Sequence, residues 1–222
     1  MKNPLKIYFL VFIFFIFSTY SVNYKSKKLS IFFPIKYILI EDNLATNISK
    51  LKSDLNVLIN TSLFFLDKEK ILSIISKHDF ISSIKLKKKY PNNLKIQLAE
   101  KIPVATKIIG KRKFYITKDN EKISFINVKI YENLPTIFGK YKKFNTFYDD
   151  LKKNNFKINE IKAFYYFDVG RWDILLRNER IIKLPENNYL NILSKINLML
   201  DDSNFSKFKI FDFRVKDQLI LQ

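Results

Sequence analysis

The residue types on which enzymes and metal sites depend are scarce in this chain of 222 residues. The chain has no cysteine, which excludes a thiol nucleophile and a disulfide framework, and it has a single histidine, His78. No group of His, Asp and Glu has metal-ligand spacing, and three glycines are too few for a phosphate-cradling loop. The sequence therefore predicts a protein that is not an enzyme, with no catalytic residue, no metal and no cofactor.

Three pairs of adjacent acids remain as candidates for acid–base chemistry. The pairs are Glu41-Asp42, Asp149-Asp150 and Asp201-Asp202. They fall in predicted loops or at predicted helix ends, where acids cap helices or face solvent. His78 falls near the end of a predicted helix, where a cationic ring interacts favourably with the last carbonyl groups. None of these residues is assigned a catalytic role.

The formal net charge of +19 raises the alternative of a nucleic-acid-binding protein. The lysines are scattered along predicted strands and turns, and the densest run, 85–89, is predicted as a solvated strand. A composition that is rich in Lys, Asn, Ile and Phe and poor in Gly and Ala is typical of proteins encoded by AT-rich genomes. We therefore expect no nucleic-acid partner, and a steep salt dependence of DNA binding would favour the alternative.

The first 22 residues contain the longest apolar segment of the chain. A helix rises about 1.5 Å per residue, so the segment 5–22 is long enough to cross a hydrocarbon core of about 30 Å. The sequence predicts a short cytoplasmic tail at 1–4, a transmembrane anchor at 5–22 and a juxtamembrane linker at 23–34. The alternative is a cleaved secretory signal, but the segment 17–23 lacks an Ala-x-Ala cleavage pattern.

Charge does not decide the orientation of this anchor, because lysines lie on both sides of it. A very short N-terminal tail usually stays in the cytoplasm. We therefore expect the large domain outside, in the periplasm of a diderm bacterium, with the anchor in the inner membrane.

Apolar periodicity after the linker predicts two units of an α+β fold. The first, 35–102, has the order strand, helix, helix, strand, strand. Its strands are predicted at 37–40, 83–90 and 94–98, with one helix from about 47 to 59 and a second that Asp67 caps. Pro91 starts the turn between the last two strands.

The second unit, 103–222, is predicted to be a mixed, β-rich domain. A hairpin joins 114–117 to 121–124, a helix covers 145–155, and an antiparallel meander follows. The meander strands are 161–167, 172–176 and 180–184. Pro185 is expected to open a helix that runs to about residue 200. Strands at 209–213 and 218–221 close the chain, and the last is predicted to be an exposed sheet edge.

Several segments resemble those of the bacterial FtsQ/DivIB family of division proteins, in the family's order. The segment 79–84 resembles the family's W-V-x-x-A-x-V, with Phe80 in place of Trp. The segments 90–96 and 100–105 resemble P-x-x-L-x-I and E-x-x-P-x-A. The segments 170–176 and 182–185 resemble R-W-D-L-x-L and V-K-L-P, and 211–214 resembles D-L-R with Phe for Leu. The short N-terminal tail departs from the family.

The resemblance implies a POTRA domain at 35–102 and an FtsQ-type β domain at 103–222. It implies a single-pass divisome protein at the division septum that links early and late division proteins. The β domain is then expected to bind FtsB and FtsL by strand addition, and the anchor and POTRA domain to contact other divisome proteins. The expected partner-binding residues are Arg171, Arg214, Val215, Gln218, Leu219, Ile220 and Leu221.

Alternatives stay open for the type of protein and for the roles of single residues. The fold order also suits a POTRA subunit of the outer-membrane transporter type, which is expected to carry a barrel after its POTRA domain. At the residue level, Trp172 is predicted to lie in the core rather than in a contact. Arg171 and Arg214 fit a solvated position at a strand end as well as a role in partner binding.

Overall fold

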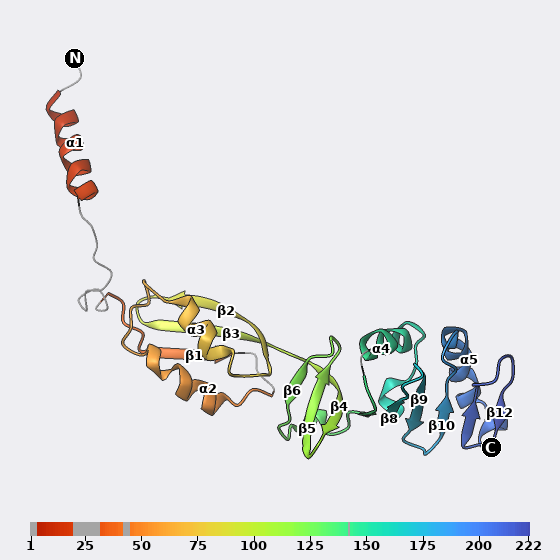
Figure 1. Cartoon of the computed structure of the whole chain (residues 1–222). Helices are drawn as coiled ribbons and strands as arrows, with labels where there is room; N and C mark the ends of the chain where they lie inside the picture. Colours follow the sequence, from red (N-terminus) through yellow and green to blue (C-terminus); the bar gives the residue numbers. More distant parts are fainter. Residues whose placement is uncertain (1–3, 20–31, 42–44, 142) are drawn as a thin grey trace. The chain divides into compact units, whose positions relative to one another are not determined.

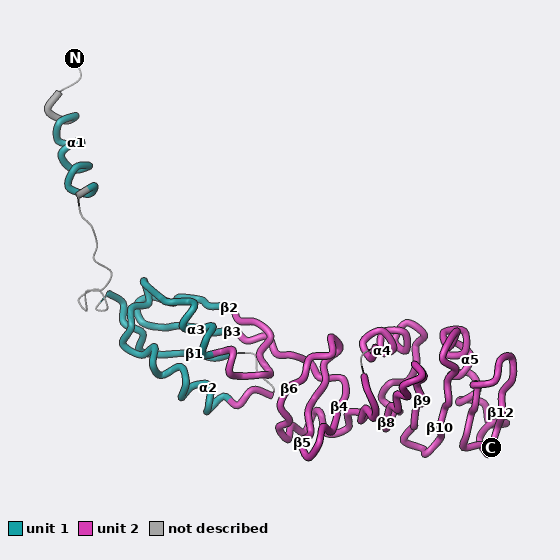
Figure 2. The backbone as a smooth tube through the Cα atoms, viewed as in Figure 1, with its two compact units in different colours: residues 1–41, 48–74, 85–97 teal, residues 42–47, 75–84, 98–222 magenta. Residues whose placement is uncertain are grey.

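Figure 1 shows a computed structural model of the chain, which describes residues 4–19, 32–41, 45–141 and 143–222. The chain divides into two compact units (Figure 2). Unit 1 comprises residues 1–41, 48–74 and 85–97, and unit 2 comprises residues 42–47, 75–84 and 98–222.

The first helix, α1, spans Pro4–Thr19 and is built almost entirely from apolar residues. Its side chains from Ile7 to Ser18 are exposed, except for the half-buried Ile13. Within the described ranges, no helix is both long enough and apolar enough to cross a membrane. Residues 1–3 of the predicted tail, 20–22 of the predicted anchor and 23–31 of the predicted linker lie outside the described residues.

The elements that follow have the predicted order strand, helix, helix, strand, strand. They are β1 (Tyr37–Glu41), α2 (Ile48–Leu55) with the 3₁₀ turn Asn56–Leu58, α3 (Lys68–Ile75), β2 (Ile81–Lys89) and β3 (Asn93–Glu100). The sheet order is β1-β3-β2, and β1 runs parallel to β3. The predicted cap of the second helix is confirmed, because Asp67 Oδ1 accepts a hydrogen bond from the Lys70 N–H at 3.1 Å.

In the part of the chain that the structure describes, nine strands form a second sheet, in the order β12-β11-β10-β9-β8-β7-β4-β5-β6. Its strands are β4 (Pro103–Ile109), β5 (Arg112–Thr117), β6 (Lys122–Ser124), β7 (Thr136–Phe138), β8 (Ile161–Tyr166), β9 (Trp172–Leu176), β10 (Ile181–Lys183), β11 (Ile210–Asp212) and β12 (Ile220–Leu221). The helices of this unit are α4 (Phe144–Lys153) and α5 (Tyr189–Asp201), with 3₁₀ turns at Lys129–Tyr131, Ile158–Glu160 and Ser203–Phe205. The predicted hairpin β5-β6 and meander β8-β9-β10 are confirmed.

The structure of this unit differs from the prediction in two respects. Strands β4 and β7 were not predicted, although they connect the hairpin to the meander. The helix predicted to open at Pro185 begins instead at Tyr189, because Asn188 adopts a left-handed conformation with φ 60° and ends the preceding turn. Asparagine tolerates this region better than most residues, so it marks a helix start here in place of the proline.

The core of unit 2 lies between one face of this sheet and helices α4 and α5. Trp172 of β9 is 4% exposed and stacks on Phe147 of α4, with ring centroids 4.8 Å apart and planes 3° apart. Leu193 and Ile196 of α5 belong to the same buried cluster. The predicted core position of Trp172 is therefore confirmed. A second buried cluster lies on the other face of the sheet at its β5–β6 end and is made of Ala45, Phe80, Tyr115, Ile123 and Tyr131.

Candidate partner-binding site

Three charged residues form one row across strands β9, β10 and β11. Lys183 lies opposite Asp173 on one side and opposite Asp212 on the other. Cross-strand neighbours share a face, and residues adjacent along a strand alternate between faces. Because Ile182 and Phe211 point into the core, this row lies on the face away from α4 and α5. Both aspartates are only 6% exposed.

Each aspartate of the row holds one of the two arginines predicted to bind a partner. The Arg171 Nε lies 3.2 Å from Asp173 Oδ1, and its guanidinium lies 4.2 Å from the centroid of the Phe167 ring. The Arg214 Nε donates to both Asp212 oxygens, at 2.8 and 3.0 Å, and its Nη2 donates to Oδ2 at 2.5 Å. The Arg214 side chain is 42% exposed and that of Arg171 is 20% exposed, so Arg214 is the more accessible cation.

The charges of both arginines act on the same carboxylate, that of Asp173. Burial raises the pKa of Asp173, while the charges of Arg171, Arg214 and Lys183 oppose this rise. Hydrogen bonds from Arg214 hold the pKa of Asp212 below its usual value, and the same bonds raise the pKa of Arg214. Asp212 is therefore a charged anchor that fixes the Arg214 guanidinium at the sheet rim.

The predicted edge strand lies at one end of the nine-strand order, next to β11. Gln222 and Ile210 exchange two backbone hydrogen bonds, with N···O distances of 2.9 and 3.1 Å. In an antiparallel pair such bonded positions alternate with non-bonded ones, so Ile220 also faces Asp212. The backbone N–H and C=O of Leu221, and of Leu219 before the strand, consequently point away from β11.

The remaining predicted site residues lie in the loop 213–219 that connects β11 to β12. A turn closes this loop through a hydrogen bond from the Gln218 N–H to the Val215 carbonyl at 3.2 Å, and Asp217 has φ 57°. Val215 is 45% exposed and Ile220 is 40% exposed, whereas Leu219 and Leu221 pack partly against the core.

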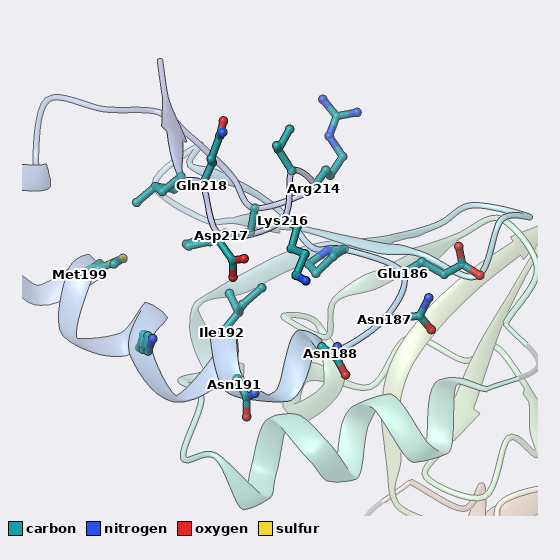
Figure 3. A pocket seen from close by; sticks show the side chains of 15 residues that line it. Glu186, Asn187, Asn188, Asn191, Ile192, Met199, Arg214, Lys216, Asp217 and Gln218 are labelled. Carbon is teal, nitrogen blue, oxygen red and sulfur yellow. The ribbon is translucent and has the colours of Figure 1, made fainter.

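A cleft of about 770 Å³ separates this loop from α5 (Figure 3). Figure 3 shows Ile192 of α5 facing Asp217 of the loop, while the Arg214 guanidinium points away from the helix. Both apolar and polar side chains line the cleft. Its lining residues are Pro185, Glu186, Asn187, Asn188, Asn191, Ile192, Lys195, Met199, Phe213, Arg214, Val215, Lys216, Asp217, Gln218 and Leu219.

Arg171 and Arg214 thus bind the two aspartates of one charged row, and β12 pairs with the strand that carries Asp212. Sequence reasoning missed the row of Asp173, Lys183 and Asp212 and the contribution of α5. The sequence does contain a signal for this row, because each of the three is a charged residue inside or at the end of an apolar strand segment. The cleft carried no such signal, because it depends on how the loop lies against α5.

Comparison with known proteins agrees with these features. Residues 33–101 match the model of the POTRA domain of the FtsQ type. The chain is 23% identical to the cell division protein FtsQ of Rickettsia conorii over 198 residues, which cover 86% of this chain and 72% of the relative. It is 24% identical to FtsQ of Rhizobium meliloti, with 86% and 63% covered, and 25% identical to FtsQ of Blochmanniella floridana, with 83% and 67% covered.

The match to the Rhizobium protein spans less than two thirds of that protein's length. The matched domain coincides with the strand-helix-helix-strand-strand unit, and the relatives share one name. Residues 33–101 thus match a POTRA domain of the FtsQ type, and the chain is similar to FtsQ cell division proteins over most of its length.

Proposed function

We propose that this chain is a non-enzymatic, membrane-anchored scaffold of the division septum. In this proposal its β domain, 103–222, binds FtsB together with FtsL by adding a strand of the partner to β12. The anchor lies in the inner membrane, with the N-terminus in the cytoplasm and the β domain in the periplasm. The POTRA domain, 35–102, and the anchor contact other divisome proteins.

The observation that carries the proposal is the free edge of β12. The Leu219 and Leu221 backbone groups point outward, and in the described part of the chain no strand lies beyond them. Unpaired N–H and C=O groups at a sheet edge are a template for an added strand. Strand addition obtains affinity from backbone hydrogen bonds and specificity from neighbouring pockets, and the cleft beside Leu219 supplies such a pocket.

Charge at the rim supports an acidic partner segment. Arg214 bonds Asp212 through Nε and Nη2, and guanidinium offers five N–H donors in a fixed fork. The remaining N–H groups of this exposed, oriented guanidinium can donate hydrogen bonds to a partner carboxylate without a new side-chain ordering cost. Lys216 lines the same cleft and adds to the positive charge.

The anchor is supported by the composition of α1. The side chains from Ile7 to Ser18 are mostly apolar and largely exposed, and exposing this much apolar surface to water is unfavourable. A bilayer removes this surface from water. The membrane anchor and the septal location are thus parts of the same proposal.

The test exploits the direction of the β12 backbone groups. Proline at Leu221 removes an outward N–H and leaves the bonds between β12 and β11 in place. We expect Leu221→Pro in the full chain, held in detergent micelles, to weaken FtsB binding at least about tenfold in calorimetry, equal to roughly 1.4 kcal/mol.

The matched control is Leu221→Ala, which removes more of the side chain but keeps the N–H group. It should bind FtsB more tightly than Leu221→Pro. Circular dichroism should show the same fold for both variants. Equal affinities of the proline and alanine variants would show that the outward N–H of β12 contributes nothing to binding.

A further inference from the structure

Unit 1 carries an exposed aromatic surface that takes no part in the β12 site. We define it by five side chains whose exposed fractions are large for aromatic residues. These are Phe32 (60%), Phe33 (43%), Phe64 (56%), Phe65 (41%) and Tyr90 (50%). A group of exposed rings on a monomer marks an interaction site, because each ring leaves apolar area in water.

Two hydrogen bonds and one ring contact join the three segments that carry these rings. The Phe33 carbonyl accepts a hydrogen bond from the Leu63 N–H at 2.8 Å, which ties the entry of unit 1 to the loop before α3. The Phe33 ring meets the Tyr90 ring edge-on at 5.0 Å, and the Lys88 Nζ donates to the Phe64 carbonyl at 2.8 Å. These contacts hold the ring-bearing segments together, so the aromatic surface is more than a set of isolated exposed side chains.

Lysines accompany the aromatic surface. Lys88 and its neighbours in β2 are exposed, as is Lys36 just after the entry segment. Asp67 follows Phe65 by two positions, but its carboxylate caps α3. Protein–protein interfaces are enriched in aromatic residues and depleted in lysine, whereas the membrane–water interface favours both rings and basic side chains.

The position of the surface in the chain points to the same partner. Phe32 follows Thr19, the last residue of α1, by thirteen positions, which span at most about 45 Å when fully extended. If α1 lies in the bilayer, as the proposed function states, this tether keeps the surface near the lipid headgroups at a high effective concentration.

We propose that the aromatic surface docks unit 1 on the headgroup region of an anionic bilayer, with the rings inserted and Lys88 at the lipid phosphates. This docking rests on the proposed anchor. It fixes unit 1 against the membrane, so that the anchor and the surface form two attachment points.

The test uses the full chain reconstituted in vesicles of phosphatidylethanolamine and phosphatidylglycerol, with Trp172→Phe to remove the only native tryptophan. One tryptophan is then placed at a time, as Phe65→Trp on the surface or as Leu72→Trp on α3. Leu72 is 54% exposed and does not belong to the surface. Lipids spin-labelled near the headgroup should quench the Phe65→Trp probe at least about twofold more than the Leu72→Trp probe.

Two further measurements make each outcome decisive. A Phe12→Trp probe in α1, measured with lipids spin-labelled deep in the acyl chain, reports insertion, so quenching there without headgroup quenching at residue 65 overturns the docking and leaves the anchor standing. The surface is then free for a protein partner. Absence of quenching at both positions overturns the anchor and the docking together, and equal quenching at 65 and 72 overturns the specific surface.

Wild-type chain supplies a readout that needs no substitution in the surface. Acylation of lysines by a water-soluble reagent, followed by mass spectrometry, should be slower at Lys88 in anionic vesicles than in neutral detergent micelles. Lys195 of α5, in unit 2, is the internal reference. Identical lysine reactivity in the two environments overturns the docking.

Discussion

At the residue scale, the candidate site depends on how two aspartates hold two arginines. Arg171 and Arg214 are visible in the sequence as basic residues beside strand segments, and the charges of both oppose the rise that burial causes in the pKa of Asp173. The aspartates were missed as partners, since the pairing of Asp212 with Lys183 depends on the register of β10 and β11. Register between strands far apart in sequence is not encoded in either strand alone.

Charge reversal at Arg214 tests whether this arginine is a specific contact. We expect Arg214→Glu to weaken FtsB binding at least about tenfold, roughly 1.4 kcal/mol, because an exposed cation would become an anion beside Asp212. Arg171→Glu should weaken binding less, since the Arg171 side chain is less exposed. The matched control is Lys87→Glu on β2. Equal losses at Arg214 and Lys87 in calorimetry would mean that overall positive charge drives binding.

At the element scale, long periodic segments were predicted and short connecting strands were not. The meander could be predicted because apolar residues either alternate with other residues or follow one another over the five or six positions of β8 and β9. Strand β7 has only three residues, and its pairing with β4 and β8 is what makes it a strand. The closing strand was predicted at 218–221 but forms only at Ile220–Leu221, since Gln218 belongs to a turn.

Gly139, just after β7, tests how tightly this strand is packed. Its φ is +83°, and a Cβ there would lie 2.1 Å from the Tyr166 carbonyl oxygen. We expect Gly139→Ala to lower the free energy of unfolding by about 2–4 kcal/mol. Gly110→Ala is the control, because Gly110 also has a positive φ but open space around it, and should cost only about 1–2 kcal/mol. Urea unfolding followed by Trp172 fluorescence measures both, and similar losses would contradict the close approach at Gly139.

At the scale of the whole molecule, the sequence predicted the α+β class, the order of the POTRA elements and the similarity to FtsQ proteins. It could not predict the nine-strand order, in which β4 lies between β7 and β5 and β10 pairs in parallel with β11. These neighbours come from distant parts of the chain, so only the folded sheet reveals them. The cleft beside α5 depends on the same long-range arrangement.

The topology of the whole chain is a further prediction. We expect a reporter enzyme fused after Gln222 to be active only in the periplasm, and the protein isolated from membranes to retain residues 1–22. The reason is the long apolar segment at 5–22 without a good cleavage pattern after it. Mass spectrometry that finds an N-terminus near residue 22 would identify the segment as a cleaved signal instead.

Amide exchange at the β12 edge tests strand addition most directly. Hydrogen exchange resolved by residue, measured on the full chain in micelles with and without FtsB, reports each backbone N–H separately. We predict that FtsB slows exchange at Leu219 and Leu221 at least about tenfold, because their outward N–H groups acquire partners. Ile220, already facing β11, should change less. Binding of FtsB that leaves Leu219 and Leu221 exchanging at their free rates would contradict strand addition at this edge.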